Sequence, residues 1–124
     1  MQVFKTKWFA KWASSQMLMD VTLNAAVVEI GHGLVDAELG GHVVKKRVAL
    51  PGKGKRGSIR TLVAFQQDDK AFFIYGFAKR ERANISDKEL KVLKLMAREL
   101  LSYTKTALAK AVKAGELIKV EDDG

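Results

Sequence analysis

Apolar residues recur at two spacings along this chain, which predicts that helices and strands alternate. Residues 3–4 are expected to form a short edge strand before a helix over residues 8–13, whose two tryptophans should anchor it on the core. A second helical pattern covers residues 21–30, where Asp20 is the expected N-cap and glycines end the helix. The N-terminal third is therefore predicted to be mainly helical.

Four strand patterns follow in the middle of the chain. Residues 34–39 alternate apolar and acidic side chains, as a half-exposed strand does. The other three patterns cover residues 43–50, 59–66 and 71–77, with a hairpin loop at 67–70. The last of them is almost continuously apolar, which predicts a strand buried on both faces and central in its sheet.

The C-terminal third returns to helical spacing. Ser86 and Glu89 have the spacing of a capping box, and an apolar stripe of one helix face then continues to residue 101. Thr104 is expected to cap a second, shorter helix that Gly115 ends, and residues 117–120 to form a final strand.

Length and composition predict one ordinary globular domain over residues 1–124. Its apolar fraction of 48% and charged fraction of 29% argue against disorder. The chain has no cysteine, which excludes disulfides and thiolate metal sites. Without a continuous apolar run long enough for a signal peptide or a membrane span, a soluble cytoplasmic protein is expected.

The positive charge is concentrated in residues 42–82. This window holds eleven Lys and Arg against three acids, a surplus that equals the formal net charge of +8. A chain whose whole surplus lies in one third of its length is expected to present a basic face to a polyanion, with nucleic acid the first candidate.

Three basic features stand out in this window. The glycine-rich run over residues 52–57 can follow phosphates closely, but it lacks the Walker spacing, so nucleotide hydrolysis is unsupported. A second cluster, Lys79 to Arg82, directly follows the predicted central strand, and a rigid strand end holds cations in place. With Arg60 on the neighbouring strand, the three features are expected to converge on one concave surface.

Several segments together carry a family resemblance: Leu-Gly-Gly at 39–41, Lys-Lys-Arg-Val at 45–48, Pro-Gly-Lys-Gly-Lys at 51–55, Gly-Ser-Ile-Arg-Thr at 57–61, Phe-Phe-Ile-Tyr-Gly-Phe-Ala-Lys at 72–79 and Asn-Ile-Ser-Asp-Lys-Glu-Leu at 84–90. With residues 4–9 and 115–120, they resemble the HigB-type branch of the RelE/ParE toxin superfamily over nearly the whole chain. The resemblance implies an α+β fold, in which a small, mostly antiparallel sheet packs against N-terminal and C-terminal helices.

The resemblance also implies a function. Toxins of this kind cut messenger RNA on the ribosome and are held silent by a cognate antitoxin, often one with a helix-turn-helix. RNA supplies its own nucleophile, the 2′-hydroxyl, so the enzyme must move protons and stabilise the charge of the phosphorane. No cofactor is implied, and no pair of histidines or carboxylates has the spacing of a metal site.

Site residues follow from the same resemblance. Arg80 corresponds to the arginine that stabilises the cleaved phosphate, Arg60 resembles the arginine of the preceding strand, and Lys79 is the candidate general base or acid. The residues expected to bind RNA or the ribosome share a positive charge: Lys45, Arg47, Lys53, Lys55, Arg56 and Arg82.

Three alternatives remain open on the sequence alone. Ser86 stands where RelE has a tyrosine used in cleavage, so the general base is not fixed. His32 is more simply a surface residue at a helix end, whereas His42 borders the basic strand and is the better histidine candidate. The rival function is a non-catalytic nucleic-acid-binding module, or a ParE-like poison of gyrase on the same fold.

Overall fold

The computed structural model describes residues 1–50, 52 and 58–121. Its elements, in chain order, are β1 (Gln2–Thr6), α1 (Lys7–Ser15), α2 (Asp20–Gly31), β2 (Ala37–Gly40), β3 (Val43–Ala49), β4 (Ser58–Gln66), β5 (Lys70–Ala78), α3 (Asp87–Leu101), α4 (Lys105–Lys113) and β6 (Leu117–Lys119). The strands form one sheet in the order β2-β3-β4-β5-β1-β6. All its pairings are antiparallel except β1 with β5, so the expected α+β fold is confirmed.

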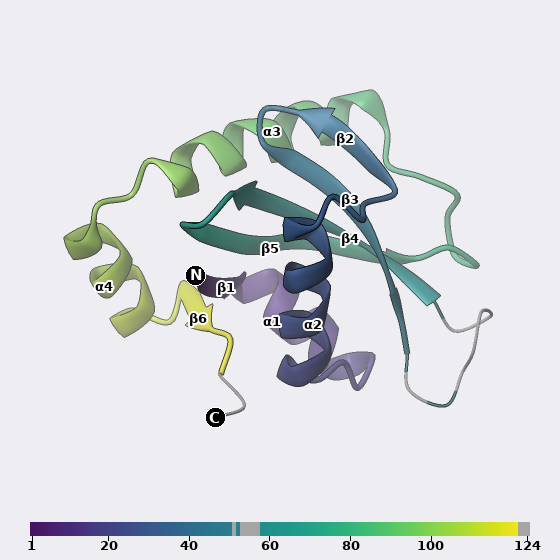
Figure 1. Cartoon of the computed structure of the whole chain (residues 1–124), viewed down its shortest axis with the longest axis horizontal. Helices are drawn as coiled ribbons and strands as arrows, with labels where there is room; N and C mark the ends of the chain where they lie inside the picture. The colour runs from purple at the N-terminus through teal and green to yellow at the C-terminus, as the bar shows by residue number, and fades with distance from the viewer. Residues whose placement is uncertain (51, 53–57, 122–124) are drawn as a thin grey trace.

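Helices cover both faces of the sheet. Figure 1 shows α3 above the sheet and α1 and α2 below it. One apolar cluster lies between the sheet and α1 and α2, and includes Phe9, Leu23, Val63 and Phe73. The other lies under α3 and α4, and includes Leu62, Phe72, Leu93 and Leu108. Strand residues alternate between the two clusters because successive side chains point to opposite faces.

Strand β5 is central, as its apolar run predicts. Seven of its residues are buried, including Phe72 and Phe73, which are fully inaccessible and belong to opposite clusters. The pairing register shifts between β4 and β5, because Leu62 lies opposite Tyr75 whereas Val63 lies opposite Phe73. Ile74 is therefore the extra residue of a β-bulge.

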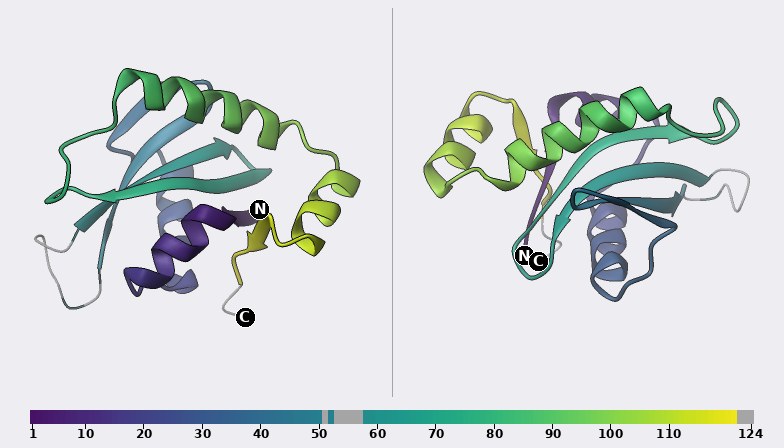
Figure 2. Two further views of the ribbon diagram at one scale, coloured as in Figure 1. Left: turned by 180° about the vertical axis from the view of Figure 1, so that it is seen from behind. Right: turned by 90° about the horizontal axis from the view of Figure 1, so that it is seen from above.

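The N-terminal strand is not the edge strand that the sequence suggests. β1 lies between β5 and β6, parallel to the first and antiparallel to the second. Val3 and Phe4 are both buried, and they belong to the two opposite apolar clusters. A strand that buries both of its faces gains more inside the sheet than at its edge. The views of Figure 2 show β6 beside the N-terminal end.

The prediction that both tryptophans anchor α1 on the core is confirmed for Trp12, which packs against it, and is wrong for Trp8. Phe9 is the fully buried residue of this helix, whereas Trp8 is 48% exposed and Trp12 only half-buried. Trp8 instead stacks on Tyr75, with the ring centroids 4.7 Å apart. The bulky indole rings cover the rim of the core, because the smaller phenyl ring already fills the space under the helix.

Asp20 does not cap α2, although the sequence makes it the expected N-cap. It is the first helical residue, and Met19 precedes it without a side-chain cap. Its carboxylate accepts hydrogen bonds from Lys5 Nζ and from the backbone N–H of Glu121, both at 2.8 Å. Partial burial acts to raise the pKa of the Asp20 carboxyl, but these hydrogen bonds lower it overall. Asp20 thus joins β1 and the segment after β6 to α2.

The alternating segment before the first glycine pair forms a shorter strand than predicted. Only Ala37–Gly40 pair with β3, and the preceding Asp36 donates its backbone N–H to the carbonyl of Lys45. Apolar and acidic alternation predicted the strand, but the side chain of Asp36 has another partner, described below. The strands 43–50, 59–66 and 71–77 agree with β3, β4 and β5 to within a residue at each end.

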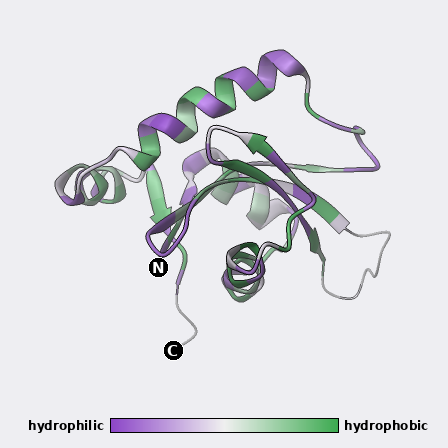
Figure 3. Ribbon diagram, turned by 45° about the horizontal axis from the view of Figure 1, so that its top comes forward, coloured by the Kyte–Doolittle hydropathy of each residue, from purple (hydrophilic) through white to green (hydrophobic). Residues whose placement is uncertain are grey.

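The helices of the C-terminal third are confirmed. Ser86 Oγ accepts from the backbone N–H of Glu89, whose side chain accepts from the backbone N–H of Ser86, so the capping box is complete. Thr104 caps α4, and Gly115 follows it with φ of +77°. Figure 3 shows hydrophilic and hydrophobic residues recurring along α3, as expected of a helix with one face on the core.

Gly76 allows α1 to approach β5 closely. A Cβ placed there would lie 2.6 Å from Cη2 and 2.8 Å from Cε3 of Trp12, well inside van der Waals contact. We therefore expect Gly76→Ala to destabilise the fold by about 1–3 kcal/mol, because the indole ring must shift out of its place. Thermal melting should show a midpoint lowered by several degrees.

The control for this variant is Gly31→Ala. Gly31 ends α2, has no left-handed φ, and its nearest atom to a new Cβ is the amide nitrogen of Gln67 at 3.8 Å. Its melting midpoint should stay level or rise, since alanine favours the helix. Equal melting of Gly76→Ala and the wild type would show that the close approach carries no constraint.

Candidate active site

The candidate site lies at one end of the sheet, where three strands meet. Ala49 at the end of β3 pairs with Ser58 at the start of β4, and Ile59 pairs with Ala78 at the end of β5. Lys79 and Arg80 follow at once in an exposed turn. The rigid central strand therefore places two cations directly beside the first residues of β4.

Two arginines face each other at this end. Arg47 of β3 lies directly opposite Arg60 of β4, and two residues along, Lys45 lies opposite Leu62. Leu62 belongs to the cluster under α3, so these three cations share the face of the sheet that α3 covers. Like charges opposite one another in neighbouring strands destabilise a sheet, which makes this pair a place for an anion.

Arg60 is held by a carboxylate. Only 9% of its surface is exposed, and its Nε lies 3.3 Å from Oδ2 of Asp36. Its Nη1 also donates to Ser58 Oγ at 3.4 Å. Asp36 offsets the cost of burying the guanidinium and fixes its direction, because a buried charge needs a partner. By contrast, Arg47 is exposed and Lys45 half-buried, and neither forms an ion pair among the described residues.

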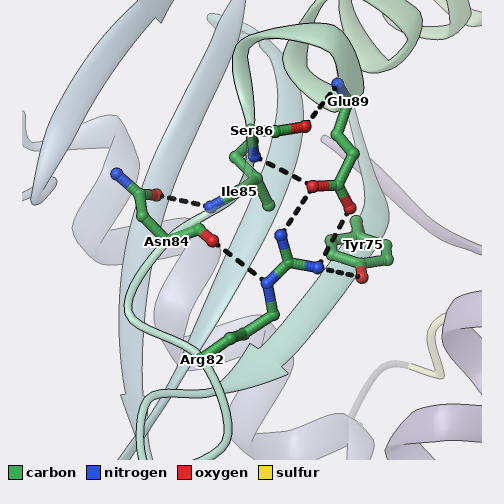
Figure 4. Close-up of polar contacts among 6 residues, drawn as sticks. All are labelled: Tyr75, Arg82, Asn84, Ile85, Ser86 and Glu89. Carbon is green, nitrogen blue, oxygen red and sulfur yellow. Dashed lines mark hydrogen bonds and ion pairs between the residues drawn. The ribbon is translucent and has the colours of Figure 1, made fainter.

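Arg82 forms the most extensive polar contacts of the site (Figure 4). Its Nη1 and Nη2 bind the two carboxylate oxygens of Glu89 at 3.0 and 2.6 Å. Its Nε donates to the carbonyl oxygen of Asn84, Nη1 donates to the hydroxyl of Tyr75, and the guanidinium lies 5.8 Å from the ring centroid of Phe77. These contacts tie the turn after β5 to β5 itself and to the start of α3.

This arrangement perturbs both partners. Hydrogen bonds from Arg82, then from the backbone and side chain of Ser86, lower the pKa of Glu89 to about 2. The Glu89 hydrogen bond in turn raises the pKa of Arg82, against a small opposing effect of desolvation. Glu89 therefore serves α3 twice, as the acidic half of the capping box and as the partner of Arg82.

The structure brings together part of the predicted set. Lys45, Arg47 and Arg60 share one face, and Lys79 and Arg80 follow β5 at the same end of the sheet. Lys53, Lys55 and Arg56 lie outside the described residues, so convergence with the glycine-rich run stays a prediction. RNA binding by Arg82 also stays a prediction. The structure shows in addition that Arg82 positions the turn after β5.

Sequence reasoning missed the two acids that organise these cations. The sequence indicated Asp36 only as an acidic residue of a predicted strand, and Glu89 only as a member of a capping box. The structure pairs them with Arg60 and Arg82. Nothing in their spacing points to Arg60 or Arg82. Each pair joins segments brought together by tertiary structure, Asp36 to Arg60 across β3 and Glu89 to Arg82 across the loop before α3.

The two histidines are both exposed. His32 is the C-cap of α2, in agreement with its reading as a surface residue at a helix end. His42 lies in the turn between β2 and β3 with φ of +64°, at the opposite end of β3 from Arg47. In the described part of the chain, no three His, Cys, Asp or Glu side chains gather as metal ligands would. Among the described helices, none is long and apolar enough to cross a bilayer.

Comparison with known proteins agrees with this arrangement of a small sheet, flanking helices and a cationic strand end. The model of one family, the RelE toxin of the RelE / RelB toxin-antitoxin system, matches residues 1–120. Searches of curated proteins and of solved structures give no significant match. The chain belongs to the RelE toxin family, and is thus the toxin component of a toxin-antitoxin system with a cognate antitoxin as its partner.

The pKa of Glu89 predicts how stability depends on pH. Because its folded pKa is about 2, below its ordinary value of 4.5, its contribution is present above about pH 4.5 and is lost as the pH falls toward 2. We expect Glu89→Gln to melt below the wild type at pH 6. The gap between the two midpoints should close as the pH falls from 5 to 2.

Glu116→Gln is the matched control, because Glu116 is exposed and forms no ion pair among the described residues. Its melting midpoint should follow that of the wild type at every pH. A gap for Glu89→Gln that persists unchanged at pH 2 would contradict the assignment of this ion pair.

Proposed function

We propose that this toxin is a HigB-type messenger RNA endonuclease that acts on the ribosome in the cytoplasm, and that its antitoxin carries a helix-turn-helix. The observation that carries the proposal is the position of Lys79 and Arg80. They are exposed directly after the buried central strand, at the end of the sheet where Arg47 and Arg60 face each other. Cations from three adjacent strands can thus surround one phosphate.

Electrostatic stabilisation is the task for which this site is best equipped. In the proposed reaction, the 2′-hydroxyl loses its proton and its oxygen attacks the adjacent phosphorus. The bond from phosphorus to the 5′-oxygen breaks as that oxygen takes up a proton. The phosphorane between these events carries extra negative charge, which fixed guanidinium groups stabilise. The products are a 2′,3′-cyclic phosphate and a free 5′-hydroxyl.

The proposal gives each site residue a role, which the environment supports for Arg80 and Arg60. Arg80 is exposed and can approach a phosphate from solvent, whereas Arg60 is fixed in direction by Asp36 and can act without reorganising. Lys79 carries the proton to or from the reacting oxygens. Lys45 and Arg47 hold neighbouring phosphates of the strand, and Lys53, Lys55 and Arg56 complete the contact to RNA or ribosome.

Arg82 supports this reaction mainly through position. With Glu89, Asn84 and Tyr75 as hydrogen-bond partners, its guanidinium fixes the short turn that carries Lys79 and Arg80. A cation on a freely moving turn would have to be ordered at the moment of reaction, which raises the barrier. The ion pair with Glu89 removes much of that cost in advance.

The proposed chemistry is tested with a messenger that carries one 2′-deoxy or 2′-methoxy nucleotide at the mapped cut site, presented on intact ribosomes. Cutting at that bond should stop, while cutting at other sites continues. Magnesium stays in the assay, because the ribosome needs it. Undiminished cutting at the modified bond would rule out the 2′-hydroxyl as nucleophile, and intact messages with broken DNA would favour gyrase poisoning.

The same assay includes Arg80→Ala, which should cut about 10²–10³-fold more slowly while melting like the wild type. Lys113→Ala is the matched control, because Lys113 is an equally exposed cation on α4. A non-catalytic binder would instead lose affinity gradually with each cation removed.

Ser86 stands at the position of the family's tyrosine, and its contacts are those of a helix cap. We expect Ser86→Ala to lose about 1 kcal/mol of stability and several degrees in melting midpoint, while its cutting rate at 20 °C stays near that of the wild type. Thr104→Ala, which removes the cap of α4, is the control and should melt lower in the same way. Normal melting with abolished cutting would make Ser86 a catalytic residue.

A further inference from the structure

A second group of cations lies on one flank of α3. Lys91, Lys94 and Arg98 are spaced three and four residues apart, which places them on the same side of the helix. Like charges at this spacing destabilise a helix by a few tenths of a kcal/mol per pair, and no acid lies between them. A count of charge along the sequence draws attention to residues 42–82 and not to this group. The group is recognised only when the residues are placed on a helix.

These three cations, like Lys45 and Arg47, have no acidic partner among the described residues. The ion pairs among the described residues engage Lys5, Lys46, Arg60, Lys70 and Arg82. Lys91, Lys94 and Arg98 take part in none of these pairs. The fold thus neutralises cations that lie against the core and leaves this flank of α3 positive.

The flank borders a hollow at the turn between β2 and β3. A Cβ on Gly41 would lie 3.5 Å from Cγ of Lys94, so the side chain of Lys94 runs over this turn. The hollow has a volume of about 580 Å³ and no acid in its lining, which consists of Gly41, His42, Gln66, Lys91, Lys94, Leu95, Arg98, Leu101 and Ser102. Three of the lining residues are thus positively charged and two are leucines.

Cations of β3 lie between the hollow and the candidate active site. Lys45 and Arg47 lie on the face that α3 covers, and His42 lies just before the same strand. Five residues of strand span about 17 Å, the distance from the hollow to Arg47. The cations thus form a track from Arg80 through Arg47 and Lys45 to the flank of α3.

We propose that the hollow holds the phosphate backbone of the RNA strand that is cut, several nucleotides away from the scissile bond. This inference rests on the proposed function. The cations of β3 between the hollow and the candidate active site favour the substrate strand over an acidic peptide, which would need no such connection. The track would fix the strand's direction and add affinity that shortened RNA lacks.

The test compares 2′-O-methyl RNAs of 4 and 16 nucleotides, which cannot be cut, by fluorescence anisotropy over a series of salt concentrations. The wild type should bind the longer RNA more tightly and with a steeper salt dependence. In the triple variant K91Q/K94Q/R98Q, the slope of log K against log salt for the longer RNA should fall by about 2, the value for three lost phosphate contacts on a single strand. Binding of the shorter RNA should not change.

The control variant is K105Q/K110Q/K113Q, which removes three exposed cations from α4. It should bind both RNAs like the wild type. An equal loss in both triple variants would overturn the track, because net charge alone would then explain the binding. Unchanged RNA binding by K91Q/K94Q/R98Q would also overturn it, including the case in which that variant loses affinity only for ribosomes or for the antitoxin.

The two proposals fail in different ways. A wild type that cuts no ribosome-bound message refutes the nuclease, while a length-dependent salt slope that K91Q/K94Q/R98Q loses still shows that this flank of α3 binds RNA. A wild type that cuts messages but binds 4 and 16 nucleotides with the same slope refutes the track alone.

Discussion

The burial of β5 on both faces is the constraint on which the rest of this structure depends. Phe72 and Phe73 are fully inaccessible on opposite sides, so the strand needs helices above and below it and paired strands on either edge. α1 and α2 supply one cover and α3 the other. Once β5 is fixed in this way, the position of the backbone directly after it is also fixed. Lys79 and Arg80 inherit that precision from a strand that contains no functional side chain of its own.

The charges of the molecule fall into two groups with different roles. Cations that contact the core, such as Arg60 and Arg82, have acidic partners that hold them in one direction. Cations that face outward, such as Arg47 and Arg80, have none among the described residues. A surface organised like this attracts anions over a wide area but places only a few guanidinium groups with accuracy. That division suits the proposed substrate, a long polyanion with one reacting bond.

Much of the fold could be predicted from the sequence, because the local signals were strong. The capping box at Ser86 and the apolar run of β5 each predicted an element that the structure contains. Two predictions that depended on contacts between distant segments were wrong. Val3 and Phe4 looked like an edge strand because a five-residue strand carries no signal of its neighbours. Asp20 looked like a cap because aspartate favours that position, but contacts with Lys5 and Glu121, far away in the sequence, determine its role.

The candidate site shows the same limit. Its cations were found from charge and family resemblance, whereas the acids that orient Arg60 and Arg82 were not. Ion pairs between distant segments leave no periodic pattern, so only the folded chain reveals them. The flank of α3 is an intermediate case, because its spacing was present in the sequence but was hidden by an overall count of charge.

The position of β1 has a consequence for the order of folding. This strand is made before the other strands, yet it pairs with residues 70–73 on one side and 117–119 on the other. Until those segments exist, its backbone groups have no partners and the sheet ends at β5. Contacts between segments so far apart in the sequence form slowly, because the chain loses conformational entropy in closing the loop before the strands pair. A partly synthesised chain therefore cannot assemble the complete sheet until residues 117–119 have been made.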